Sequence, residues 1–187
     1  MSIRSAKKSD FKQVSPLIIQ AMEDLAMKFT QSSTIEKAIS LFEHFFQLEN
    51  NQYSYENTLV YEENNEIMGS ITAYDGSKLN ELRKPFLDYL LENYGFEQIP
   101  ENETGKGEFY FDTISVSPQH QGKGIGKKLI LAMLNLAKEK GFEKAGLLVD
   151  VENPSAKKLY KRIGFQIVGN KDLMGGKYEH LVYEISN

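Results

Sequence analysis

The second half of the chain reads His120-Gln121-Gly122-Lys123-Gly124-Ile125-Gly126-Lys127-Lys128-Leu129. Three glycines at alternate positions lie between an apolar run that ends near Val116 and an amphipathic run that begins at Lys127. Glycine adopts backbone angles that other residues avoid, and it lets another molecule approach the main chain closely. Successive N–H groups at the start of a helix bind anions, and the helix dipole strengthens that binding. This loop is therefore predicted to hold a phosphate group.

Two familiar phosphate loops do not match this spacing. A Walker A loop requires Gly-Lys followed by serine or threonine, whereas Gly126-Lys127 is followed by Lys128. A dinucleotide fingerprint requires a glycine three residues after the second one, and Lys127 occupies that position after Gly124. The pattern that fits is Gln121-x-x-Gly124-x-Gly126. It resembles the Gln/Arg-x-x-Gly-x-Gly/Ala signature of the GNAT superfamily of acetyl-CoA-dependent N-acetyltransferases.

A second segment resembles the same family. It reads Asn153-Pro154-Ser155-Ala156-Lys157-Lys158-Leu159-Tyr160-Lys161-Arg162-Ile163-Gly164-Phe165, against the family's Asn-x-x-Ala-x-x-Leu-Tyr-x-x-x-Gly-Phe. The resemblance implies that Asn153 contacts the cofactor arm and that Tyr160 stands beside its sulfur. The residues alone leave another interpretation open, because Asn153 is a good helix cap and a tyrosine on an apolar helix face usually belongs to a core.

The strand that leads into the glycine loop also fits the family. Its end, Ile114-Ser115-Val116-Ser117-Pro118, is similar to the apolar-x-Val-x-Pro of the family's fourth strand. In that family a bulge after this strand separates it from its neighbour, and the freed backbone pairs with the pantetheine arm. The resemblance thus implies an acetyl-CoA site made of Ile114, Ser115, Val116, Gln121, Gly122, Lys123, Gly124, Ile125, Gly126, Lys127, Asn153 and Tyr160. Lys128 is a further candidate for neutralising phosphate.

The chemistry of acetyl transfer asks for a base and an acid. A lysine-type amine, with a pKa of about 10.4, is neutral in only about one molecule in 10³ at pH 7. A buried carboxylate could accept its proton, and a phenol could protonate the leaving thiolate, the role that the resemblance implies for Tyr160. Strand alternation over 108–116 puts Tyr110 and Asp112 on one face and Phe111 and Thr113 on the other. Asp112 is therefore the predicted base, the alternative being that it only bonds local backbone or a core hydroxyl.

The pattern of apolar residues outlines the fold. It predicts helices over about 11–28, 34–49, 127–140 and 154–163, and strands over about 3–6, 59–62, 67–73, 108–116, 145–151, 165–168 and 178–185. Residues 1–187 are predicted to form one α/β (α+β) domain. As in the resembled family, its sheet is expected to be mixed, mostly antiparallel and twisted, with helices on both faces.

Residues 75–106 depart from a minimal member of that family. Leucines and aromatic residues recur at helical spacings between Leu79 and Tyr94, which predicts a helical insertion at the sheet edge, between the third and fourth strands. The insertion could cover the acceptor site, with Phe86, Tyr89 or Tyr94 as aromatic lining, or it could form a homodimer contact.

Composition sets broader limits. The 187 residues include 22 basic and 26 acidic side chains, a net charge of −4, which argues mildly against non-specific nucleic-acid binding. The absence of cysteine excludes disulfides and an acetyl-cysteine intermediate. No apolar run approaches the roughly 20 residues of a membrane span, and no signal-peptide core is seen. We therefore expect a cytoplasmic protein without membrane contact, and, since no histidine–carboxylate grouping occurs, no metal.

The predicted reaction is transfer of an acetyl group from acetyl-CoA to the primary amine of a small molecule, by direct attack in a ternary complex. Within this class the alternative is an acetyltransferase for protein N-termini or lysines. From another class the alternative is an acyl-CoA-binding sensor without catalysis, which would have no use for Tyr160. The sequence leaves open the acceptor and whether the acyl group is acetyl or longer.

Overall fold

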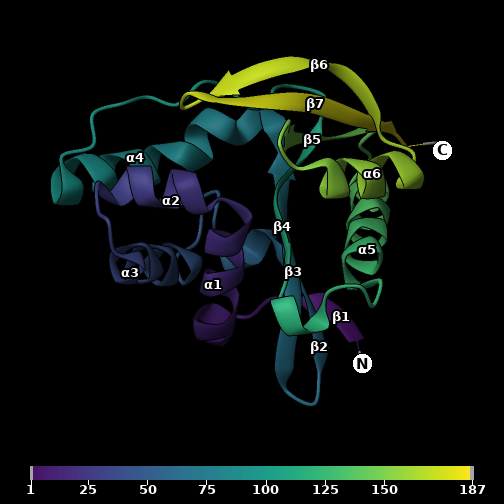
Figure 1. Cartoon of the computed structure of the whole chain (residues 1–187), viewed down its shortest axis with the longest axis horizontal. Coiled ribbons are helices and arrows are strands. Elements are labelled where there is room, and N and C mark those ends of the chain that lie inside the picture. The colour runs from purple at the N-terminus through teal and green to yellow at the C-terminus, as the bar shows by residue number, and fades with distance from the viewer. Residues whose placement is uncertain (1, 186–187) are drawn as a thin grey trace.

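In the described part of the chain, a mixed sheet of seven strands runs through the middle of the molecule and carries helices on both faces (Figure 1). The computed structural model describes residues 2–185, so residue 1 and residues 186–187 of the predicted domain lie outside the described part. The strands are β1 (Ser2–Ser5), β2 (Thr58–Glu63), β3 (Glu66–Asp75), β4 (Phe109–Val116), β5 (Lys144–Asp150), β6 (Gln166–Leu173) and β7 (Gly176–Glu184).

The strand order is β1-β2-β3-β4-β5-β7-β6. Within residues 2–185 all neighbouring strands are antiparallel except β4 and β5, which run parallel. A parallel pair needs a crossover connection, and here the glycine loop and helix α5 (Ile125–Glu139) provide it. The predicted fold class, a mostly antiparallel mixed sheet with helices on both faces, is confirmed.

Each face of the sheet has its own hydrophobic cluster. Helices α5 and α6 (Pro154–Ile163) pack on one face, where Leu129 and Met133 meet Phe111. Helices α1 (Phe11–Ala21), α2 (Glu23–Thr30), α3 (Ile35–Phe46) and α4 (Leu79–Tyr94) cover the opposite face, where Phe42 and Phe86 are almost fully buried. Figure 1 shows the two helical layers on opposite sides of the sheet.

Local sequence signals explain several boundaries. Asn64 and Asn65, with φ of 52° and 64°, form the tight turn between β2 and β3, because asparagine tolerates the left-handed region that such hairpins need. The side chain of Asn153 accepts a hydrogen bond from the backbone N–H of Ala156 and so caps α6. Gly164, at φ 123°, ends the same helix. These predicted features are confirmed.

The predicted helix over 11–28 is wrong in one respect, because the chain forms two helices, α1 and α2, broken at Met22. No glycine or proline lies near Met22 to signal the break. Tertiary packing accounts for it, since α1 packs against β3, β4 and α3, whereas α2 packs against α3 and α4.

The insertion is helical as predicted, but its predicted place at a sheet edge is wrong. Within the described chain the edge strands are β1 and β6, whereas α4 joins the layer of α1–α3 on one face. Phe86 and Leu90 of α4 are buried in the cluster of that face. The apolar side of the helix is thus covered by this chain's own aromatic residues.

Strand β4 contains a bulge at Asp112. Thr72 of β3 pairs with Thr113 and the next residue, Ala73, pairs with Phe111, so Asp112 is an extra residue without a partner. The bulge shifts the alternation, and Ile114 and Val116 pack in the cluster of Phe111. The prediction that Thr113 shares the face of Phe111 is therefore wrong, and the bulge lies within the strand rather than after it.

Candidate active site

Strands β4 and β5 separate just where the bulge begins. They pair only from Phe109 with Ala145 to Phe111 with Leu147. Beyond that point the strands enclose a cleft of about 920 Å³, which extends to the glycine loop, the start of α6 and the break between α1 and α2. Predicted site residues that line it are Asp112, Ile114, Ser115, Val116, Gln121, Gly122, Gly124, Ile125, Gly126, Lys127, Asn153 and Tyr160.

The glycine loop has the geometry that the sequence predicts. Gly122 and Gly124 have φ of 77° and 78°, a region that residues with a side chain rarely adopt. A Cβ at either position would meet no described atom within 4 Å, so the space above both is open. Gly124 is the N-cap of α5, and the helix presents free N–H groups there.

The three lysines of this region differ in placement. Lys127 lines the cleft. Lys123 is exposed, and among the described residues it is not part of the cleft wall. The ammonium group of Lys128 lies 5.4 Å from the centre of the Tyr61 ring, in a cation–π contact.

The backbone of β4 offers hydrogen-bonding groups to the cleft. The N–H of Ser117 donates to Met68 of β3, and strand residues direct their backbone groups alternately to either side. Ile114 and Val116 therefore point theirs away from β3, towards the gap left by β5. The carbonyl of Val116 accepts bonds there from the side-chain amides of Gln20 and Gln121, at 2.9 and 3.1 Å.

Ser115 behaves differently from its two neighbours. Its backbone faces β3, so the main-chain contact predicted for it is not available to a ligand in the cleft. The residue borders the cleft, but its hydroxyl is buried and has no hydrogen-bond partner in the described part of the chain. A buried polar group without a partner is costly unless a ligand or water satisfies it.

These features fit acetyl-CoA. The open glycine loop with its free N–H groups suits a pyrophosphate, and Lys127 adds positive charge beside it. The backbone of Ile114 and Val116 suits the amide-bearing pantetheine arm. The cleft is also long enough to connect the loop with Tyr160.

Tyr160 lies on α6 with its ring against Phe165, at a centroid distance of 6.0 Å. The side chain is 9% exposed, and burial raises the pKa of its hydroxyl to about 12. Within residues 2–185 that hydroxyl has no hydrogen-bond partner. The Tyr160 ring is thus part of the core, as expected of a tyrosine on an apolar helix face, and the residue also lines the cleft.

Asp112 is held by two side chains that the sequence did not single out. Its Oδ2 accepts hydrogen bonds from the Tyr74 hydroxyl at 2.8 Å and from the Gln52 amide at 3.1 Å. Burial and the neighbouring charge of Glu103 raise the pKa of the Asp112 carboxyl to about 7. A carboxyl group with that pKa can both accept and release a proton near neutral pH.

A small cavity of about 90 Å³ continues from Asp112 into the helical layer. Its walls come from α2 and the α1–α2 break, the α3–β2 connection, the insertion and strands β4 to β7, and include Met22, Phe29, Gln52, Tyr53, Arg83, Phe86, Glu103, Tyr110 and Tyr178. Of the three aromatic residues proposed as lining, Phe86 takes part. Tyr89 stacks on His44 and Tyr94 packs beside Tyr89, and within the described chain neither lines the cavity.

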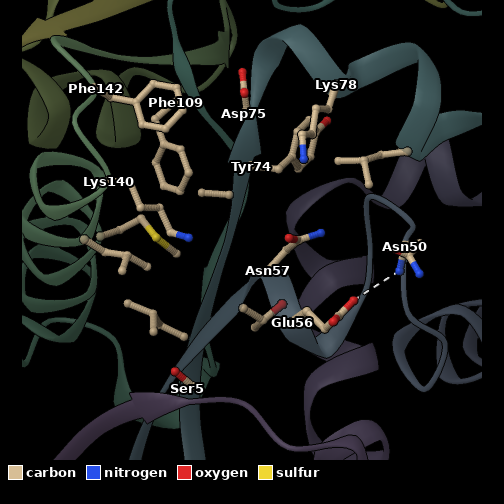
Figure 2. Close-up of a pocket in the computed structure, with 16 residues that line it drawn as sticks. Ser5, Asn50, Glu56, Asn57, Tyr74, Asp75, Lys78, Phe109, Lys140 and Phe142 are labelled. Carbon is tan, nitrogen blue, oxygen red and sulfur yellow. Dashed lines mark hydrogen bonds between the residues drawn. The ribbon is translucent and has the colours of Figure 1, made fainter.

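A second groove, of about 570 Å³, lies along β3 and is shown in Figure 2. Lys140 and Phe142 stand on one side of the strand in that view, and Asn57 and Glu56 on the other. None of the predicted site residues lines this groove in the part of the chain described. Tyr74 links it to the active site, because its ring lines the groove while its hydroxyl reaches Asp112.

Comparison with known proteins identifies the class. The family model described as the acetyltransferase (GNAT) family matches residues 19–165, and the chain belongs to that family. A crystal structure described as an acetyltransferase is 31% identical and covers 100% of both chains, with a TM-score of 0.83. The N-acetyltransferase from Staphylococcus aureus Mu50 is 25% identical, covers 98% of this chain and 100% of that one, and has a TM-score of 0.87.

Among curated proteins, the spermine/spermidine N(1)-acetyltransferase of Bacillus subtilis (strain 168) is 32% identical over 85 residues, 45% of this chain and 56% of that protein. The chain spans about half or less of the length of the curated relatives that it matches. In the part of the chain described, no helix is both long and apolar enough to span a membrane.

Proposed function

We propose that the protein transfers an acetyl group from acetyl-CoA to the primary amine of a small molecule, by direct attack in a ternary complex. The observation that carries the proposal is the position of Asp112. This carboxylate lies where the cleft of the glycine loop meets the small cavity, so it borders both spaces. Family membership supports acetyl transfer, and the acceptor is argued from the cavity.

Asp112 is proposed as the general base. An amine that enters the cavity arrives mostly as an ammonium ion, since its pKa lies near 10. Above pH about 7 the Asp112 carboxyl is ionised, and it can accept the proton directly or through one water. Tyr74 and Gln52 both donate to Oδ2 and so orient the carboxylate, which leaves Oδ1 as the oxygen that accepts the proton.

Tyr160 is proposed as the general acid. With a pKa of about 12, its hydroxyl stays protonated at neutral pH. It can therefore donate a proton to the sulfur that departs when the amide forms. The hydroxyl has no competing partner among residues 2–185, so it is available to a ligand in the cleft.

Acetyl-CoA would supply the activated acetyl thioester. The residues proposed to hold it are those of the glycine loop, with Ile114, Val116 and Asn153. Gln20 and Gln121 both donate to the Val116 carbonyl, so we expect these amides to move or to share that acceptor when the pantetheine arm binds.

A small acceptor is favoured over a polypeptide. The cavity beyond Asp112 is small, and buried residues that include Phe29 of α2 and Arg83 and Phe86 of α4 surround it. The spermine/spermidine acetyltransferase of Bacillus subtilis offers a first acceptor class to try. A protein acceptor remains the second candidate. A dimer contact through the insertion is less supported, because α4 buries its apolar side within this chain.

The test is an acceptor panel assayed by CoA release. Spermidine, spermine, short monoamines, free lysine and a peptide with a free N-terminus would each be incubated with acetyl-CoA and the protein. We expect turnover with at least one small amine and little with the peptide. Tight acetyl-CoA binding without turnover on any amine would instead favour the sensor, and turnover on the peptide alone would favour a protein acceptor.

A further inference from the structure

Two carboxylates meet at a single hydroxyl beside the proposed base. The Tyr74 hydroxyl lies 2.8 Å from Asp112 Oδ2 and 3.5 Å from Glu103 Oε1. A phenol has one proton, and the shorter distance assigns it to Asp112. Glu103, which belongs to the segment after α4, therefore lies close to Asp112 without receiving the Tyr74 proton.

Glu103 is held in this position by Arg83 of α4. The Arg83 guanidinium donates to Glu103 at 3.0 Å and also to the carbonyls of Pro100 and Glu101. Arg83 is 4% and Glu103 8% exposed. The backbone of the same segment is fixed from the other side, where Lys171 of β6 donates to the carbonyls of Asn102 and Glu103.

We propose that Glu103, anchored by Arg83, is a positioning residue that acts on Asp112 through the charge it holds beside the Tyr74 hydroxyl, and so fixes the pH range in which the acceptor amine is deprotonated. The inference rests on the proposed function, in which Asp112 is the base. It gives the insertion a specific role, since Arg83 and Glu103 both belong to the segment of chain that connects β3 to β4.

The direction of the effect follows from the charges around Asp112. Two neighbouring carboxylates resist simultaneous ionisation, so Glu103 favours the protonated form of Asp112. The hydrogen bonds from Tyr74 and Gln52 favour the ionised form, and so does the positive charge of Arg83. The titratable or charged groups that border Asp112 or its cavity are Tyr53, Tyr74, Arg83, Glu103, Tyr110 and Tyr178.

The test is a ¹³C-carboxyl NMR titration of the aspartate-labelled protein, with the Asp112 signal assigned by its loss in Asp112→Asn. We expect a midpoint near pH 7 in the unmodified protein. In Glu103→Gln the midpoint should fall by about one pH unit, because the neighbouring charge is gone. In Tyr74→Phe it should rise, because a hydrogen bond to the ionised form is gone.

Glu101→Gln is the matched control. It makes the same chemical change two residues away, on an exposed side chain that accepts a bond from the Met174 N–H instead, and it should leave the midpoint unchanged. If Glu103→Gln does not fold, Glu103→Asp keeps a charge for Arg83 but withdraws it from Tyr74, and a smaller fall is expected. An Asp112 midpoint that stays constant in the folded Glu103 variant, or moves equally in Glu101→Gln, overturns the proposal.

The acid limb of kcat/KM, measured with the best amine of the acceptor panel, should move in the same direction as the NMR midpoint. The two readouts separate the two claims. If no amine is acetylated yet the midpoint moves as expected, the proposed function fails and the coupling stands. If an amine is acetylated and the midpoint does not move, the coupling fails alone.

Discussion

The proposed cofactor side and the proposed acceptor side of the cleft depend on different kinds of sequence information. On the cofactor side, the glycine loop and the cap of α6 are short motifs in which neighbouring residues set the geometry. On the acceptor side, Asp112 is held by Gln52 and Tyr74 from distant parts of the chain. The difference teaches that the geometry of the proposed cofactor side follows from local sequence, whereas the geometry of the proposed acceptor side depends on tertiary packing.

The largest effect is expected from Asp112→Asn on the acceptor side. The substitution keeps the shape and removes the base, so kcat/KM should fall by about 10³ at pH 7. Without a base the variant must use amines that are already neutral, and their fraction rises tenfold per pH unit up to a pKa near 10. The deficit should thus be greatest at and below pH about 7, where Asp112 titrates, and shrink above it.

Initial rates from pH 6 to 9.5 would check this, with acetyl-CoA affinity as the control for an intact cofactor half. A variant profile parallel to that of the unmodified protein over this whole range would remove Asp112 from the role of base.

Tyr160→Phe should have the next largest effect. The ring packs against Phe165 in either case, so the fold and acetyl-CoA affinity should be retained. Loss of the proton donor should lower kcat by about 10², measured as CoA release at saturating substrates. If turnover is unchanged, Tyr160 is a core residue only, and another group protonates the leaving thiolate.

A tenfold effect is expected from Gly124→Ala on the cofactor side. The residue has φ of 78° and open space above it, so alanine would strain the backbone and project into the phosphate space. Calorimetry should show acetyl-CoA binding weakened about tenfold, or about 1.4 kcal/mol. Gly175→Ala is the control, because Gly175 has a similar φ of 83° but lies in the β6–β7 turn, outside the cleft. It should introduce a similar backbone strain and leave acetyl-CoA binding unchanged. Equal affinities in all three proteins would contradict the assignment of the loop.

The smallest effect is expected from Phe86→Leu in the cavity wall. The Michaelis constant of the acceptor should rise a few-fold while that of acetyl-CoA stays constant, since Phe86 lines only the acceptor half. Stability should fall by on the order of 1 kcal/mol. Tyr89→Leu is the control on the same helix, because its ring packs on His44 outside the cavity. A similar rise in both variants would mean that α4 acts through general packing.

Sequence patterns predicted the sheet, the hairpin and the glycine loop because each depends on local periodicity or on backbone angles that few residues tolerate. They did not predict the break at Met22, since helical periodicity continues through it and packing on two different surfaces causes it. The bulge at Asp112 was misplaced because strict alternation cannot show an extra residue.

The partners of Asp112 were missed for a related reason. Gln52, Tyr74 and Glu103 are separated from Asp112 by 60, 38 and 9 positions in the chain, and no motif marks them. Predicted placement of the insertion failed because its apolar residues indicate a buried helix without indicating which surface buries it.

The central claim is that acetyl-CoA and the amine meet at Asp112, where the two halves join. A crystal structure of the complex with acetyl-CoA tests it most directly. We expect the pyrophosphate on the backbone of the 121–126 loop and the acetyl group beside both Tyr160 and Asp112, facing the small cavity. A complex with the pyrophosphate elsewhere would contradict it. So would an acetyl group more than about 6 Å from the Asp112 carboxylate, which is too far for a direct or water-mediated proton transfer.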